Sequence, residues 1–375
     1  MIFELDDSLF ELQGRDATRL KVFFYECLER QHRITVNPPY SDTRDDPVNR
    51  WLDAHEGERD ELEDVLVFGF GGVEDPDEIS TFEVYVRANL DEDWSASKPV
   101  VNLESARRLV EAGLLVLMED WDDDVWFVRT QARLAGKLTQ LEQSEDKCQI
   151  RFDSFGGKDQ ILKRLREVIV PEPSLRCRTV VIFDSDARRP WNQLNPADAR
   201  AQPGGAPFES DASRLLRARQ ALMPPGNARL LKVCEDDQAP LAHYPLTRRT
   251  IESYVPVQAL FTSAERLHRR PQRQAMKAAA EAFKGLNPAQ REHFNMKEGF
   301  NGDAGADACR WAGGLYDGVS EDTKSKLARG FNFAGSPLGG SFKPTERPLF
   351  TDGHLHRDGQ ETEAKRLVMC ILEMV

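Results

Sequence analysis

Two short apolar runs in the middle of the chain each end in acidic residues. Residues 114–118 (Leu-Leu-Val-Leu-Met) precede Glu119, and residues 180–183 (Val-Val-Ile-Phe) precede an Asp-Ser-Asp triplet that begins at Asp184. Helical patterns separate the two runs, so we expect parallel strands joined by right-handed crossovers. Their carboxyl ends would meet at one edge of the sheet, where crowded carboxylates repel one another unless a divalent cation lies among them.

Helix and strand signals alternate from Asn102 onward. Asn102 can cap a helix that ends near Gly113, directly before the first acidic strand. Further helices are expected at 124–138, 161–169 and 246–255, and further strands at 148–152 and 228–234. This alternation is typical of an α/β fold with a parallel sheet.

A chain of 375 residues exceeds the usual size of a single domain, so appendages to this α/β core are expected. Residues 1–101 combine a helical stretch at 20–28 with strict alternation at 82–87, which predicts an N-terminal α+β unit. Residues 102–257 form the expected core with its parallel sheet flanked by helices. Residues 258–375 are predicted to be a mostly helical C-terminal region, because their helical patterns are broken by glycine-rich turns.

Composition and net charge argue against several classes of protein. No apolar run approaches the roughly 20 residues of a membrane span, and the first residues do not resemble a signal peptide, so a cytoplasmic protein without a membrane partner is expected. The six cysteines show no paired C-x-x-C spacing, which argues against a zinc ribbon. A net charge of -13 disfavours a protein that coats nucleic acid by charge alone, although local basic surfaces remain compatible with it.

Four short motifs in this order resemble the TOPRIM domain, in the form found in OLD-family nucleases and related bacterial anti-phage nucleases. The family pattern has Glu-Gly with a nearby Asp after the first strand, then Gly-Gly-Lys, Asp-x-Asp after the third strand, and an Arg-x-x-Glu-x-Tyr-x-Pro segment. The corresponding segments here are 119–123, 156–158, 184–186 and 249–256. One departure is Asp120, which stands where the family has glycine.

The resemblance implies a TOPRIM-like fold whose carboxylates bind Mg²⁺ or Mn²⁺, with two ions expected. Glu119, Asp184 and Asp186 would hold one ion and act as the catalytic residues, while Asp123 and Glu252 would help to hold a second. Two ions roughly 3.5 to 4 Å apart can activate water and stabilise the leaving oxygen of a phosphodiester.

The same resemblance implies a metal-dependent endonuclease that acts on DNA or on structured RNA such as tRNA. Residues expected to contact the nucleic-acid backbone are Lys158, Arg188, Arg189, Arg248 and Arg249. The core contains no Walker A motif, and many defence nucleases of this type work with an ABC-type ATPase, so such a partner protein is expected. A homo-oligomer is also compatible with the family.

Two alternatives stay open. A haloacid-dehalogenase-like phosphatase also carries Asp-x-Asp after an apolar strand and uses the first Asp as its nucleophile, but it has Thr or Val shortly afterwards, where this chain has Ala187-Arg188-Arg189. The other alternative is a regulatory or binding subunit with a TOPRIM fold and an inactive acidic cluster, which the departure at Asp120 keeps open.

Overall fold

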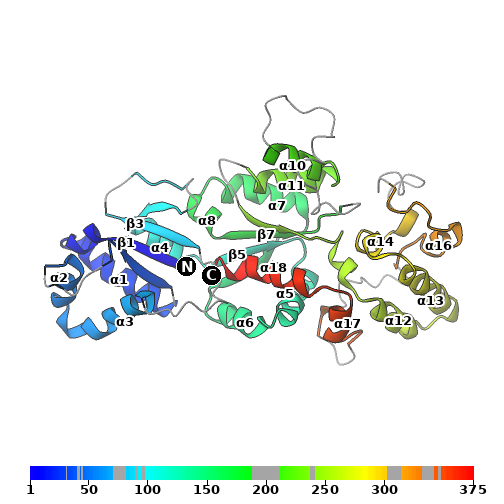
Figure 1. Ribbon diagram of the computed structural model, residues 1–375, viewed down its shortest axis with the longest axis horizontal. Coiled ribbons are helices and arrows are strands. Elements are labelled where there is room, and N and C mark those ends of the chain that lie inside the picture. The colour runs from blue at the N-terminus through cyan, green and yellow to red at the C-terminus, as the bar shows by residue number, and fades with distance from the viewer. Residues whose placement is uncertain are drawn as a thin grey trace.

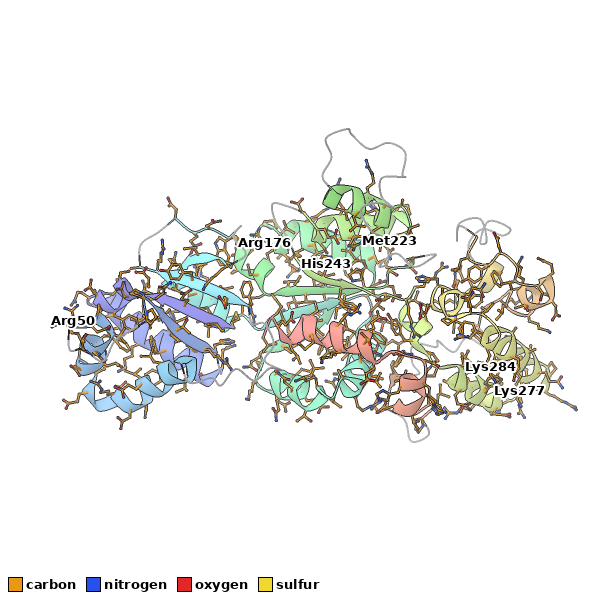
Figure 2. The ribbon with its side chains drawn as sticks, in the orientation of Figure 1. Arg50, Arg176, Met223, His243, Lys277 and Lys284 are labelled. Atoms are coloured by element: carbon orange, nitrogen blue, oxygen red, sulfur yellow. The ribbon has the colours of Figure 1, made fainter. Side chains whose placement is uncertain are left out.

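The computed structural model describes residues 1–30, 32–39, 43, 45–70, 82–88, 91–94, 98–187, 211–236, 241–301, 314–331, 342–344 and 348–375. The molecule is elongated (Figure 1). Two sheets follow one another along its long axis, and a helical region lies beyond the second sheet. Arg50 on α2 and Lys277 on α13 lie toward opposite ends of this axis (Figure 2). Among the described residues, no helix is both long enough and apolar enough to cross a membrane.

The N-terminal unit is built on a four-stranded sheet with the order β2-β1-β3-β4, and all of its strands are parallel. The strands are β1 (Ile2–Asp6), β2 (Arg33–Asn37), β3 (Glu83–Arg87) and β4 (Val100–Asn102). The helices are η1 (Asp7–Glu11), α1 (Arg15–Glu29), α2 (Pro47–Asp53), η2 (Glu56–Glu58), α3 (Arg59–Phe70) and α4 (Leu103–Glu111). The expected α+β unit is therefore an α/β unit, because parallel neighbours need helical crossovers between them.

The packing of α4 moves the boundary of this unit. Asn102 caps α4 as predicted, since its side chain accepts a hydrogen bond from the Ser105 amide at 2.9 Å. Leu103, Leu109 and Val110 are buried in the same apolar cluster as the N-terminal strands. The N-terminal core thus continues to Val110, about ten residues beyond the predicted boundary at 101.

The second sheet is also four-stranded and parallel, with the order β6-β5-β7-β8. Its strands are β5 (Leu114–Met118), β6 (Ile150–Ser154), β7 (Thr179–Phe183) and β8 (Ala242–Pro245). The strands expected at 114–118 and 180–183 are confirmed, the strand expected at 148–152 lies at 150–154, and β8 was not predicted. The chain runs outward from β5 to β6 and then returns to β7 on the other side of β5. The order therefore reverses between β5 and β7, where ligands of open parallel sheets bind, outside the carboxyl ends of the strands.

Helices cover both faces of the second sheet (Figure 1). On one face, α5 (Trp121–Leu134), α6 (Leu138–Asp146) and α18 (Glu361–Leu372) share an apolar cluster with Val116 and Ile182. On the other face, α7 (Lys158–Arg164) with its π-helical continuation η3 (Leu165–Ile169), and α11 (Pro225–Cys234), share a cluster with Leu117 and Val181. Successive residues of one strand thus pack into the apolar clusters on opposite faces of the sheet.

The strand expected at 228–234 is wrong, because this segment lies in α11. Pro225 occupies the first turn of the helix, where its missing N–H costs no hydrogen bond. Leu230, Leu231 and Cys234 are buried together at a helical spacing. A short apolar run with this spacing fits a helix and a strand about equally well from sequence alone.

The C-terminal region is mostly helical, as expected, but it does not form a separate core. Its elements are η4 (Ile251–Tyr254), α12 (Val257–Arg266), α13 (Arg270–Lys284), α14 (Pro288–Glu292), η5 (Gly299–Asn301), α16 (Glu321–Lys326), α17 (Asp352–Arg357) and α18. The remaining described helices are α8 (Pro173–Cys177) and α10 (Asp211–Gln220). One apolar cluster extends from Leu114 to Leu372, so the last helix completes the core of the second sheet.

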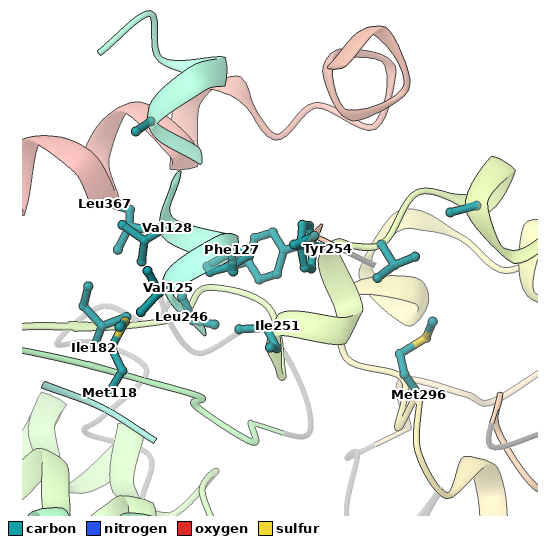
Figure 3. Close-up of a cluster of buried hydrophobic side chains, with 14 of the residues drawn as sticks. Met118, Val125, Phe127, Val128, Ile182, Leu246, Ile251, Tyr254, Met296 and Leu367 are labelled. Carbon is teal, nitrogen blue, oxygen red and sulfur yellow. The ribbon is translucent and has the colours of Figure 1, made fainter. Parts of the chain in front are cut away.

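Phe127 and Tyr254 join the sheet layer to the segment that follows β8. Figure 3 shows the two rings, whose centroids are 4.9 Å apart. The ring of Phe342, on a third segment, has its centroid 5.2 Å from that of Phe127. The Tyr254 hydroxyl donates to Glu363 of α18, whose carboxylate also accepts the Thr247 amide at 2.8 Å. These contacts connect α5, η4 and α18 behind the carboxyl edge of the sheet.

Replacing Phe127 by Ala should lower the free energy of unfolding by about 3 to 5 kcal/mol, because a fully buried ring is lost and a cavity remains. Trp121→Ala is the matched control, since Trp121 is an aromatic residue of the same helix and is 53% exposed. We expect the control to change stability by about 0.5 kcal/mol or less. Chemical denaturation followed by circular dichroism measures both, and equal losses would contradict the packing described for Phe127.

Candidate functional site: a carboxylate cluster at the carboxyl edge of the second sheet

Glu119 and the Asp-Ser-Asp triplet meet where the strand order reverses. Glu119 directly follows β5, and Asp184 directly follows its neighbour β7, with Leu117 and Val181 paired in register. The Asp184 amide donates to Oε1 of Glu119 at 3.2 Å. The structure therefore brings together the three residues that the sequence analysis singled out as catalytic, in the position expected for them.

The start of α5 explains how Asp120 replaces the glycine of the family pattern. Asp120 has φ -125° and ψ 130°, an extended conformation that does not require glycine. Its Oδ1 accepts the amides of Asp122 and Asp123 at 2.9 and 3.0 Å, so Asp120 is the N-cap of α5. The departure from the pattern thus has a local structural role as a helix cap.

Asp124 belongs to the cluster, although the sequence analysis did not assign it there. Its Oδ2 accepts the backbone amides of Glu119 and Asp120 at 3.0 and 2.9 Å, which fixes the turn between β5 and α5. Burial raises the pKa of Asp124 to about 7, and the neighbouring carboxylates of Glu119 and Asp120 contribute to the increase.

Lys158 lies between two of the cluster carboxylates. Gly156 and Gly157 have φ values of 75° and 115°, which favour glycine, and they turn the chain so that Lys158 begins α7. Its Nζ is 3.3 Å from Glu119 Oε1 and also contacts Asp186 Oδ2. Burial lowers the pKa of Lys158, but the charges of Asp186 and Glu119 outweigh it and hold the pKa above its ordinary value.

The Asp-Ser-Asp loop is held by contacts from two other segments, residues 249–251 and α11. Asp184 Oδ1 accepts the Ile251 amide at 2.9 Å, and the Asp186 amide donates to the Arg249 carbonyl at 2.8 Å. The buried Asn227 of α11 donates to the Asp184 carbonyl at 2.5 Å and to Asp186 Oδ2 at 3.2 Å. These bonds stabilise Asp186 at φ 48°, a left-handed conformation that Asp tolerates better than most residues.

Glu252 approaches the cluster from η4. It is 3% exposed, and Lys297 Nζ lies 3.0 Å from its Oε1. Its Oε2 is buried and has no hydrogen-bond partner among the described residues. A buried carboxylate oxygen without a donor is costly, so this atom is a suitable ligand for a cation.

The cluster carries more negative than positive charge. Burial raises the pKa of Asp184 well above its ordinary value, and Glu119, Asp186, Glu252 and Asp124 raise it further. Burial likewise raises the pKa of Glu119, although Lys158 opposes the shift. The donor set consists of carboxylate oxygens, which Mg²⁺ and Mn²⁺ prefer.

No three carboxylate, histidine or cysteine side chains are arranged as a ready metal site in the part of the chain that the structure describes. Instead, the ammonium group of Lys158 contacts both Glu119 and Asp186. The residues fit a hard divalent cation by their oxygen donors and by the unpartnered Glu252 Oε2, provided that Lys158 moves aside.

Two side chains expected at the site, those of Asp123 and Arg248, form other contacts. Asp123 faces Lys343, whose Nζ is 3.0 Å from its Oδ1. Arg248 and Arg249 are buried, and the Arg248 guanidinium donates to the carbonyls of Ser253 and Asp358. The Arg248 side chain therefore binds backbone carbonyls of the chain itself, and its contact with a nucleic-acid backbone stays a prediction. Arg188 and Arg189 lie outside the described residues.

Three residues of the site were missed by the sequence analysis: Asp124, Asn227 and Lys297. Asp124 was expected only as the first residue of the helix at 124–138, although its place five residues after Glu119 is a usable signal. Asn227 was hidden by the wrong strand assignment at 228–234. Nothing in the sequence around Lys297 distinguishes it from a surface lysine.

Comparisons with protein-family models, with curated proteins and with solved structures gave no match to this chain. The site is therefore defined by its own geometry: partly buried carboxylates that follow β5 and β7, the buried carboxylate of Glu252 in η4, and Lys158 between Glu119 and Asp186.

The raised pKa of Asp124 predicts a dependence of stability on pH. A carboxyl group whose pKa is higher in the folded chain stabilises the fold while it is protonated. This contribution is complete below the unfolded value of about 3.8 and is lost as the pH rises through about 7. In EDTA, Asp124→Asn should therefore flatten the fall in unfolding free energy between pH 4 and pH 7, by on the order of 4 kcal/mol.

Urea denaturation at several pH values measures this effect. Asparagine keeps an oxygen that can accept the Glu119 and Asp120 amides but does not ionise. Asp122→Asn, at an exposed position in the same turn of α5, is the control and should keep the wild-type profile. An unchanged profile in Asp124→Asn would contradict the burial described for this carboxyl group.

Proposed function

We propose that this protein is a divalent-metal-dependent endonuclease with a TOPRIM-like catalytic domain, and that it acts as an effector in bacterial anti-phage defence. The observation that carries the proposal is the meeting of Glu119, Asp184 and Asp186 at the reversal of strand order, with Lys158 beside them. The order of the motifs supports the TOPRIM assignment, because Gly-Gly-Lys lies between the two acidic strand ends and Glu252 follows them.

The residues of the cluster would have two roles, metal binding and positioning of the Asp-Ser-Asp loop. Glu119, Asp184 and Asp186 would hold Mg²⁺ or Mn²⁺, and Glu252 would contribute to a second position through its free oxygen. When bound, the cations would activate water and stabilise the charge that develops on the phosphodiester. Asn227 and the Ile251 amide orient the Asp-Ser-Asp loop. Once released from Glu119 and Asp186, Lys158 would contact a phosphate oxygen.

The proposed substrate is DNA or a structured RNA such as tRNA. Because the net charge is -13, binding of the phosphate backbone would depend on positively charged side chains at the site, including Lys158 and Lys297. The proposed partner protein is an ABC-type ATPase. The core of this chain has no Walker A motif, so ATP-dependent control would come from a second protein.

Asp184→Asn and Glu119→Gln should each reduce Mn²⁺-dependent cleavage at least about a hundredfold, because each removes a charged ligand while nearly keeping the side-chain shape. Supercoiled DNA, linear DNA and total tRNA are tested as separate substrates. The full chain is assayed alone and after copurification with the product of the neighbouring gene.

Glu142→Gln, at an exposed position on α6, is the matched control and should keep wild-type cleavage. Thermal melting confirms that all variants are folded. Full activity in both Asp184→Asn and Glu119→Gln would reject the nuclease assignment, and cleavage of one substrate alone would identify the substrate class.

A second candidate is a non-catalytic regulatory subunit with the same fold. The observation that favours it is the contact of Lys158 with Glu119 and Asp186, which closes the space between these carboxylates. Calorimetric titration separates the two candidates. A catalytic protein should bind Mn²⁺ at millimolar or lower concentration, and Lys158→Met should bind it at least as tightly. Absence of binding in both proteins would favour the regulatory subunit.

A further inference from the structure

A cavity of about 220 Å³ lies behind the carboxylate cluster, between the segment that leads into η4, α14 and the end of α17. Three arginines from these three segments line it: Arg248, Arg291 and Arg357. Arg357 and its neighbour Asp358 are exposed, so the cavity opens to solvent on their side.

Arg248 provides a buried positive charge in the cavity wall. It is 8% exposed, and its guanidinium carbon lies 4.9 Å from the centre of the Tyr254 ring. Its Nη1 and Nη2 donate to the carbonyls of Ser253 and Asp358 at 2.9 and 3.1 Å. A guanidinium has five N–H donors, so three remain, and no carboxylate among the described residues forms an ion pair with Arg248.

Arg291 and Arg357 are also without an ion pair in the described part of the chain. Nη1 of Arg291 donates to the carbonyls of Leu286 and Lys284, the latter at 3.2 Å. Lys284 lies at the end of α13 (Figure 2). Nε of Arg357 donates to the Gly353 carbonyl at 2.9 Å. Both side chains are thus positioned by backbone carbonyls and not by ion pairs with carboxylates of the described residues.

Two carboxylates, those of Glu292 and Asp358, also line the cavity. Neither forms an ion pair with the three arginines, although Arg248 and Arg291 act on Asp358 through their electrostatic field. Three guanidinium groups against two carboxylates leave an excess of one positive charge. Positioned guanidinium groups are suited to planar, two-point recognition of phosphate oxygens.

We propose that this cavity binds a single phosphate group, held by Arg248, Arg291 and Arg357. The volume is below the roughly 300 to 1,000 Å³ of typical small-molecule sites, which suits a phosphate ion or a terminal phosphate better than a whole nucleotide. The opening beside Arg357 would allow the remainder of a phosphorylated chain to lie outside.

The backbone that carries Arg248 also supports the carboxylate cluster. The Arg248 carbonyl accepts the Ser185 hydroxyl at 3.0 Å, and the Arg249 carbonyl accepts the Asp186 amide. The segment 248–249 therefore connects the proposed phosphate site, through the Arg248 side chain, with the Asp-Ser-Asp loop, through its backbone carbonyls. Binding there does not require that the carboxylate cluster be catalytic.

Calorimetric titration of the full chain with orthophosphate in chloride buffer tests the site. Arg291→Gln and Arg357→Gln should each weaken phosphate binding about tenfold, since each removes charged hydrogen bonds. Arg19→Gln, on α1 of the N-terminal unit, is the matched control and should bind as the wild type does. Arg248 is left unchanged because its contacts also support the fold, and melting curves confirm that each variant is folded.

The source of the phosphate is tested with two oligonucleotides that differ only in a 5′-phosphate or a 5′-hydroxyl. Tighter binding of the phosphorylated strand, lost in Arg357→Gln, would support a nucleic-acid end as the ligand. Orthophosphate binding without this difference would support a free phosphate ion. Equal orthophosphate affinity in wild type and both arginine variants, or no wild-type binding at about 10 mM, would overturn the proposal.

Discussion

Repulsion among carboxylates at the ends of β5 and β7 is the constraint on which the second half of the molecule depends. Asp184 is buried against Glu119 and Asp186, and such a group is costly unless donors or cations surround it. The backbone amide of Ile251, the side chain of Asn227 and the ammonium of Lys158 supply that compensation. Loops from far apart in the sequence are therefore held at one edge of the sheet by their contacts with this cluster.

Much of the central sheet could be predicted, because its strands are short, apolar and bounded by glycine, Asn102 or acidic residues. The meeting of Glu119 with the Asp-Ser-Asp triplet followed from strand direction alone. The features that could not be predicted depend on tertiary contacts. The run at 228–234 is a helix because its apolar side chains pack together on one side, and Arg248 is buried by segments more than a hundred residues later. Neither fact has a local signal.

The two sheets share one strand order, although the sequence shows no repeat. In the N-terminal sheet, the corresponding strand ends carry Asp6 and Arg87, whose Oδ2 and Nε lie 3.7 Å apart, and the Tyr85 hydroxyl donates to Asp6 at 2.9 Å. Opposite charges thus neutralise this edge within the chain itself. The same topology supports a balanced pair in one unit and an excess of carboxylates in the other, so charge at the strand ends distinguishes the two sheets.

The carboxylate of Glu363 has a consequence for how the protein is made. It accepts the Thr247 amide and the Tyr254 hydroxyl, and thereby joins α18 to the segment that contacts Asp184. During synthesis on the ribosome, β5 and β7 emerge long before residue 363. The segment around η4 cannot gain these bonds until α18 has left the exit tunnel. In a nascent chain, the segment that contacts Asp184 is thus synthesised before the helix that joins it to the core of the second sheet.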